Sequence, residues 1–89
     1  MADAFQLKVA TPEKLVVDEQ VTSAELPGQD GYMGILAGHA PLLSALGEGK
    51  LTYSSGGSDT VLDIDGGFVE VFDNVVSVLA DHVKPADKG

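Results

Sequence analysis

The segment from residue 28 to residue 49 constrains the fold most, because glycine recurs through it at short intervals. The six glycines are Gly28, Gly31, Gly34, Gly38, Gly47 and Gly49, and Pro41 lies among them. Glycine weakens a helix through its backbone freedom, and proline interrupts one by removing a donor and clashing with the preceding turn. The segment therefore excludes a long helix and predicts short strands joined by tight bends.

The rest of the chain shows the residue alternation of strands. Phe5, Leu7 and Val9 alternate with Gln6 and Lys8, which is typical of a half-buried strand. We expect further strands, each bounded by turn residues, at residues 15–18, 21–26, 50–54, 59–65, 68–72 and 75–80. A helical period does not persist over ten residues anywhere, so we expect almost no helix. Short strands at this spacing predict an all-β antiparallel sandwich or barrel.

Phenylalanine marks one face of the strand expected at residues 68–72. Phe68, Glu70 and Phe72 share one face, whereas Val69 and Val71 share the other. We therefore expect at least one face of this strand to carry aromatic packing.

The length and composition indicate one globular domain. The 89 residues are 44% hydrophobic and 21% charged. There is no cysteine, which excludes a disulfide framework, a thiolate nucleophile and a cysteine-based metal site. We assign residues 1–84 to the domain and residues 85–89 to a polar C-terminal tail.

The charge excludes some partners and favours others. Fourteen Asp and Glu residues face five positive residues, all of them lysine, for a net charge of −9. This charge repels phosphate backbones and anionic membrane surfaces, and arginine, which suits phosphate recognition, is absent. The apolar stretch at residues 75–80 is far shorter than the ~20 residues of a membrane helix. We expect no nucleic acid and no membrane insertion, but a protein partner with basic patches.

Two motifs that would bind ligands fail on inspection. Asp63 and Asp65 resemble the start of a calcium loop, but Gly67 and Asn74 stand where that loop needs coordinating side chains. The glycine-rich segment lacks the Gly-Lys-Ser/Thr of a phosphate loop, and Asp30 would repel a phosphate. We therefore expect no metal and no cofactor.

Two histidines are the candidate bases near neutral pH, His39 and His82. A serine nucleophile assembled with His39 and an aspartate stays open as an alternative, although no Gly-x-Ser-x-Gly elbow supports it. A turn or interface position suits His39 better, because Gly38 precedes it and Ala40-Pro41 follows it. We expect no catalytic residue, and the sequence favours a binding or structural module.

The glycine-rich segment also carries a family resemblance. Residues 31–43 read Gly-Tyr-Met-Gly-Ile-Leu-Ala-Gly-His-Ala-Pro-Leu-Leu. They resemble the Gly-x-x-Gly-Ile-x-x-Gly-His-Ala-Pro-Leu-Leu hallmark of the epsilon subunit of F-type ATP synthases, called delta in mitochondria. The glycine pair leading into residues 66–71 and the strand at residues 74–81 are similar to the family in order and spacing. The resemblance spans about residues 5–82.

The resemblance implies a fold and a role. The fold would be a ten-stranded antiparallel β-sandwich of two sheets. The subunit would be non-catalytic and would belong to the rotating central stalk. There it would bind the gamma subunit and the membrane ring of c subunits and couple proton-driven rotation to ATP synthesis. It would lie peripherally on the cytoplasmic face of a bacterial inner membrane, with an organellar membrane as the less favoured setting.

The resemblance also implies interface positions. The c-ring contact would be formed by Gln29, Asp30, Gly31 and Tyr32. The gamma-subunit interface would include Thr11, His39, Pro41, Leu42 and Ser44. Tyr32 stands where several family members carry an acid, and Ala37 replaces a proline common before the Gly-His pair. Whether Leu42 and Leu43 fill the core or an interface stays open.

The C-terminal helical hairpin of the family has no counterpart after Lys84 in this sequence. The expectation is a subunit that couples the rotor without inhibiting ATP hydrolysis by helix extension. Two alternatives stand beside it. One is a small enzyme that uses His39, and the other is a free-standing acidic β-sandwich adaptor for a basic protein partner.

Overall fold

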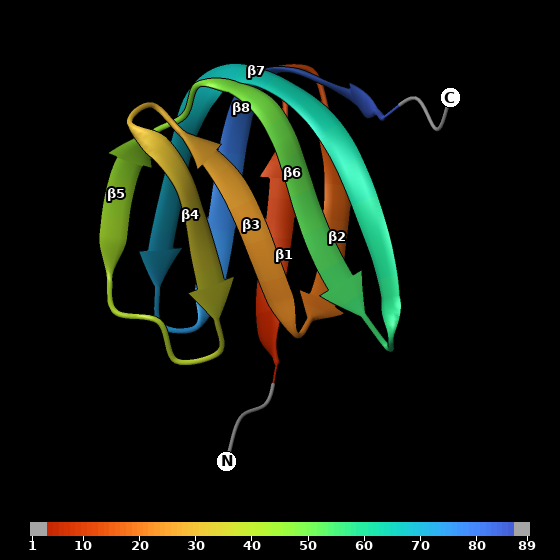
Figure 1. Ribbon diagram of the computed structural model, residues 1–89, viewed down its shortest axis with the longest axis vertical. Coiled ribbons are helices and arrows are strands. Elements are labelled where there is room, and N and C mark those ends of the chain that lie inside the picture. The colour runs from red at the N-terminus through yellow and green to blue at the C-terminus, as the bar shows by residue number, and fades with distance from the viewer. Residues whose placement is uncertain (1–3, 87–89) are drawn as a thin grey trace.

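Strands account for all the regular structure in residues 4–86, which are the residues that the computed structural model describes (Figure 1). The eight strands are β1 (Phe5–Ala10), β2 (Leu15–Val21), β3 (Ser23–Gly28), β4 (Gly31–Leu36), β5 (Leu42–Ala45), β6 (Glu48–Ser55), β7 (Ser58–Phe72) and β8 (Val75–Pro85). Their hydrogen-bonded order is β2-β1-β8-β7-β6-β3-β4, and β5 pairs with β7.

The two longest strands, β7 and β8, each take part in two layers. Residues 58–65 of β7 pair with β6, whereas residues 68–71 pair with β5. Residues 75–79 of β8 pair with β1, and the strand continues beyond β1 along β7. The first layer therefore contains β2, β1, β5, the start of β8 and the end of β7. The second layer contains β4, β3, β6, the start of β7 and the end of β8. Figure 1 shows β7 arching over the molecule from one layer to the other.

Gly66 and Gly67 make the bend in β7 possible. Their φ angles of +68° and +113° lie in the region that favours glycine. A Cβ atom on Gly67 would lie 2.0 Å from the carbonyl oxygen of Leu79. The backbone at the bend is hydrogen-bonded to the β5–β6 connection, because Gly66 N donates to Gly47 O at 3.1 Å and Leu46 N donates to Gly67 O at 2.9 Å. Two backbone groups at the bend, Gly66 N and Gly67 O, thus have hydrogen-bond partners outside the strand pairs.

The core lies between the two layers and is built from alternate residues of the strands. Phe5, Leu7 and Val9 of β1 are buried, as their alternation predicts. Other large, fully buried side chains are Val21, Leu26, Ile35, Leu51, Val69, Val71 and Val76. Burying a side chain of this kind contributes about 1.5–3 kcal/mol to stability. The strand patterns therefore direct one face of each layer inward and leave the other face for solvent or a partner.

A polar contact joins the layers at Tyr53. This side chain comes from β6, is buried, and donates its hydroxyl to Glu19 Oε2 of β2 at 3.2 Å. Burial is the main cause that raises the pKa of Tyr53 above its ordinary value near 10, and the negative charge of Glu19 raises it further. The neutral hydroxyl is therefore the form that the fold favours.

The structure corrects the expected architecture in two respects. It has eight strands, not ten, and residues 59–65 and 68–72, which were expected as two strands, belong to one continuous strand that bends at the two glycines. It is not wholly antiparallel, because β1 and β8 pair in parallel. The short strands β4 and β5 confirm the prediction of short strands and bends for the glycine-rich segment. Alternation within a strand does not specify which strand lies beside it, so the parallel pair left no signal in the sequence.

The predicted domain and tail boundary falls at the end of β8. The strand ends at Pro85, and Ala86 N donates to Val61 O at 3.1 Å. Residues 1–3 of the predicted domain and residues 87–89 of the predicted tail lie outside the described residues. The boundary at residue 84 stays a prediction.

Replacing Gly67 by alanine tests the bend. We expect Gly67→Ala to lower the free energy of unfolding by about 3–5 kcal/mol, because the Cβ would overlap a backbone oxygen and the φ angle is strained for alanine. Urea denaturation measures the change. The matched control is Gly56→Ala in the β6–β7 hairpin, where φ is +59° and a Cβ would meet nothing within 4 Å. Gly56→Ala should lower the free energy of unfolding by about 1 kcal/mol. Equal losses of unfolding free energy in the two variants would contradict the steric explanation.

The pKa of Tyr53 predicts a stability change at alkaline pH. Above pH ~10 the unfolded chain releases the Tyr53 proton while the folded chain retains it. The contribution of Tyr53 to the free energy of unfolding is therefore fully present below pH ~10 and is lost as pH rises through the raised pKa of the folded chain. Tyr53→Phe removes the titrating group. We expect the difference in unfolding free energy between wild type and Tyr53→Phe to be constant from pH 7 to 9.5 and to shrink above it. Denaturant titrations over this range measure the difference, and a constant value up to pH 11.5 would overturn the explanation.

Candidate functional site

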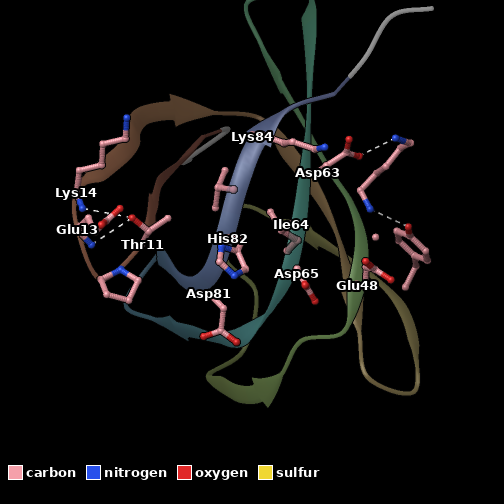
Figure 2. A pocket seen from close by; sticks show the side chains of 15 residues that line it. Thr11, Glu13, Lys14, Glu48, Asp63, Ile64, Asp65, Asp81, His82 and Lys84 are labelled. Carbon is pink, nitrogen blue, oxygen red and sulfur yellow. Dashed lines mark hydrogen bonds and ion pairs between the residues drawn. The ribbon is translucent and has the colours of Figure 1, made fainter.

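An open groove of about 1030 Å³ lies beside the end of β8. Figure 2 shows Thr11, Glu13 and Lys14 on one side of His82 and Asp63 and Glu48 on the other. Lys50 Nζ lies 2.7 Å from Asp63 Oδ1 in a solvent-accessible ion pair, which is worth at most about 1 kcal/mol. Both acidic side chains and lysines line the groove. Its electrostatic potential therefore favours neither anionic nor cationic ligands.

The chemistry of the groove offers no activated nucleophile. His82 pairs across the strands with Asp65, not with a serine or threonine. The Thr11 hydroxyl oxygen accepts hydrogen bonds of 3.3 Å from the N–H groups of Glu13 and Lys14, which holds the β1–β2 turn. Within residues 4–86, acidic and histidine side chains form no group of three that could hold a metal ion. The groove therefore gives the enzyme alternative no support.

His39 lies in the loop of residues 37–41 between β4 and β5. Its N–H donates to Leu36 O at 3.1 Å, and its Nδ1 lies 2.7 Å from Ala40 O. The side chain is half-buried, and the two partners are Leu36, the last residue of β4, and Ala40 of the loop. This arrangement is that of a turn residue.

The structure separates the roles of Leu42 and Leu43. Leu42 pairs with Val71 and packs against the core, whereas Leu43 pairs with Glu70 and is 74% exposed. Ser44 shares the inward side of β5 with Leu42 and pairs with the buried Val69. Of the two leucines that the sequence left open, Leu43 is therefore the one available to a partner.

The turn predicted to contact the c ring joins β3 to β4. Gln29 N donates to Ala45 O at 3.2 Å, and Asp30 and Gly31 are exposed. The hydroxyl of Tyr32 lies beside Gly49 and accepts a 3.0 Å hydrogen bond from Lys50 N. A Cβ at Gly49 would lie 2.6 Å from that hydroxyl, so the glycine makes room for the tyrosine. The turn is thus held at both sides while its tip stays open to solvent.

The predicted interface residues do not form one cluster. The His39 loop and the turn at Gln29–Tyr32 lie at opposite ends of β4, roughly 17 Å apart at 3.3 Å per residue. Thr11 follows the end of β1 that pairs with Leu79, whereas the loop contacts the β7–β8 turn beside Val75. Thr11 therefore lies at the other end of the first layer from His39, with the outer face of that layer between them.

That outer face carries an apolar row that the sequence analysis did not identify. The strand register places Leu15, Ala10, Leu79, Phe68 and Ala45 side by side across five strands. Phe72 and Leu43 lie on the same face, and four of its large side chains are mostly exposed: Leu43 74%, Phe68 57%, Phe72 64% and Leu79 52%. We call these four side chains the apolar face. The shared side of Phe68 and Phe72 was predicted, but their exposure was not.

The outer face of the second layer is different in character. Alternation along β6 and β7 turns Glu48, Lys50, Asp63 and Asp65 outward, and Glu25 lies on neighbouring β3. Exposed apolar patches are unusual on a solvent-facing sheet and mark contact surfaces. Tyr32 and Leu36 on β4 are also exposed in the second layer, at 56% and 65%, but the first layer carries four large exposed apolar side chains and is therefore the candidate contact surface.

The sequence matches a known family over residues 4–86, described as the ATP synthase delta/epsilon chain β-sandwich domain. Among curated relatives, the ATP synthase epsilon chain of Solibacter usitatus is 49% identical over 88 residues, which are 99% of this chain and 66% of the relative. The epsilon chain of Leptospira interrogans is 43% identical over 91% of this chain and 64% of the relative. The chain spans 57% to 67% of the length of the curated relatives it matches.

Solved structures share the fold. One chain in a structure of the Euglena gracilis mitochondrial ATP synthase, comprising OSCP, F1 and the c-ring, has a TM-score of 0.89 and 27% identity over 96% of this chain and 55% of that chain. A chain in the Tetrahymena thermophila mitochondrial ATP synthase central stalk and c-ring has a TM-score of 0.77 at 16% identity, covering 90% of this chain and 65% of that chain, which shows the fold alone. Within residues 4–86, no helix has the length and apolar character needed to cross a membrane.

Proposed function

This chain belongs to the family of ATP synthase delta/epsilon β-sandwich domains, and from that membership we propose that it acts as a non-catalytic subunit of the central stalk, or rotor. In this role it binds the gamma subunit and the c ring and couples ion-driven rotation to ATP synthesis. It works in F1 at the cytoplasmic face of a bacterial membrane, a setting that the bacterial epsilon chains among its relatives support. The observation that carries the proposal is the apolar face.

The apolar face suits gamma because a permanent rotor contact needs apolar area with specific polar edges. Phe68, Phe72, Leu79 and Leu43 supply that area, and Glu70 and Lys8 lie in the neighbouring row. Large apolar side chains at the centre of an interface contribute most of its binding energy. His39, Pro41 and Thr11 border the two ends of this face, which agrees with their proposed place at the edge of the gamma interface.

The turn at residues 29–32 suits the c ring. It is a short connection held by the Gln29–Ala45 and Tyr32–Lys50 hydrogen bonds, and it presents Asp30 to solvent. An exposed carboxylate on a rigid turn attracts basic groups on the polar loops of a partner. Because this turn and the apolar face belong to one two-layered body, force applied at the turn reaches the gamma interface through strands.

Binding of gamma tests the apolar face. We expect Phe68→Ser to weaken the affinity for the purified gamma subunit of the same ATP synthase about 30-fold, because an interface centre of this kind contributes about 2 kcal/mol or more per aromatic side chain. Leu79→Ser should act in the same direction. Isothermal titration calorimetry measures the dissociation constants, with denaturation curves to establish that each variant is folded.

The matched control is Leu36→Ser, which replaces a side chain of 65% exposure on β4 of the second layer. Its affinity for gamma should stay within about threefold of wild type, because Leu36 is exposed on the second layer and lies outside the apolar face. Wild-type chain that fails to bind gamma would contradict the proposal. Binding that is unaffected at Phe68 and Leu79 but collapses in 0.5 M salt would favour the acidic adaptor, for which the net charge of −9 is the supporting feature.

Reconstitution tests coupling. Membranes depleted of the epsilon subunit should regain ATP-driven ion pumping when a polypeptide of these 89 residues is added, without a fall in ATP hydrolysis. We expect Asp30→Lys to reduce the regained pumping severalfold through charge repulsion at basic ring loops while leaving gamma affinity unchanged. Fluorescence quenching reports pumping and phosphate release reports hydrolysis. Strong inhibition of hydrolysis that survives detergent would contradict the proposed absence of inhibition by these residues.

A further inference from the structure

The turn between β7 and β8 has an unusual backbone. Asp73 and Asn74 have φ angles of +50° and +63°, and they are the described residues other than glycine with positive φ. Asparagine tolerates this left-handed conformation better than most residues. The turn alone would therefore accept asparagine or glycine at position 74, so the backbone conformation does not by itself require the asparagine side chain.

The Asn74 side chain joins two distant segments. Its Oδ1 accepts a 2.8 Å hydrogen bond from Gly38 N, and its Nδ2 donates a 2.8 Å hydrogen bond to Ala4 O. Its backbone oxygen also accepts from Gln6 N at 3.2 Å. One side chain thus uses its donor and its acceptor on residues 70 and 36 positions away in the sequence, and it is partly shielded from solvent.

The Gly38 contact holds the loop that contains His39. Residues 37–41 cross from the edge of the second layer to the edge of the first, and Gly38 has a φ of +79° with open space around its Cα. The N–H of His39 is bonded within the loop, to Leu36 O. The hydrogen bond from Gly38 to Asn74 therefore fixes the loop against the first layer at the end of β7, beside the exposed Phe72.

We propose that Asn74 is the positioning residue of the His39 loop: it holds Gly38 so that the loop and the apolar face present one preformed surface to the gamma subunit. The inference rests on the proposed function, since gamma is the partner that this surface would bind. Holding a loop in its bound conformation before contact removes an ordering cost from binding. Asn74 itself need not touch gamma for this effect.

Three variants separate positioning from stability. Asn74→Gly retains the favourable backbone conformation and removes both side-chain hydrogen bonds. Asn74→Asp retains an oxygen to accept from Gly38 N and loses the donor to Ala4 O. Asp73→Gly changes the neighbouring residue of positive φ in the same turn and leaves Asn74 in place.

The experiment measures amide hydrogen exchange of Gly38 by NMR in the free chain, and the affinity for purified gamma by calorimetry. We expect Asn74→Gly to increase the Gly38 exchange rate and to weaken gamma binding about five- to tenfold. Asn74→Asp should keep the Gly38 amide protected from exchange and should bind gamma within about threefold of the wild-type affinity. Asp73→Gly should match wild type in both the Gly38 exchange rate and the gamma affinity. A general loss of stability would instead raise exchange in β1, β7 and β8 together.

Each outcome decides a separate question. Unchanged Gly38 exchange in Asn74→Gly overturns the positioning role. Increased exchange with unchanged gamma affinity overturns its connection to binding and leaves the proposed function standing. If wild-type chain does not bind gamma, the proposed function fails, the binding half of the inference falls with it, and the exchange measurement alone decides whether Asn74 holds the loop.

Discussion

The bend of β7 at Gly66 and Gly67 is the constraint on which the rest of the structure depends. A strand of 15 residues can belong to both layers only if its backbone adopts φ angles that residues with a Cβ avoid, and only if nothing projects toward Leu79. At the bend, Gly66 N donates to Gly47 O and Gly67 O accepts from Leu46 N. These hydrogen bonds fix the β5–β6 connection at the same place. Two layers follow from one sheet, and the core forms where they face each other.

This architecture gives the described residues two broad outer surfaces. The inner faces are filled by side chains such as Leu7, Leu51 and Val69, so the outer faces remain for partners. Register then decides the character of each outer face. In the first layer it aligns Phe68 with Leu79, whereas in the second it aligns Lys50 with Asp63. A partner that binds through apolar contacts can therefore distinguish the two faces without any pocket.

The sequence predicted the elements better than their arrangement. Alternation located β1 and identified the inward face of Phe5, Leu7 and Val9, and the glycine-rich segment correctly excluded a long helix. The glycine pair misled, because Gly66-Gly67 reads as a strand end although β7 is one strand that pairs with β8 on both sides of it. The resemblance identified the family, which the match over residues 4–86 confirms. The apolar face and the role of Asn74 depend on cross-strand neighbours, which one sequence does not specify. The predicted gamma and c-ring residues stay predictions.

Hydrogen bonds connect the bend of β7 and the turn after β7 to the two proposed contact regions, the β3–β4 turn for the c ring and the His39 loop for gamma. At one end, Gln29 is bonded to Ala45, and Gly47 N donates to Pro27 O at 2.8 Å, which joins the β3–β4 turn to the bend of β7. At the other end, Asn74 joins the His39 loop to the turn that follows the same strand. Both proposed contacts are therefore fixed to β7, and β7 runs through the layer that bears the apolar face. A load applied to the turn would be carried by paired strands, which resist stretching, and not by a flexible linker between the two interfaces.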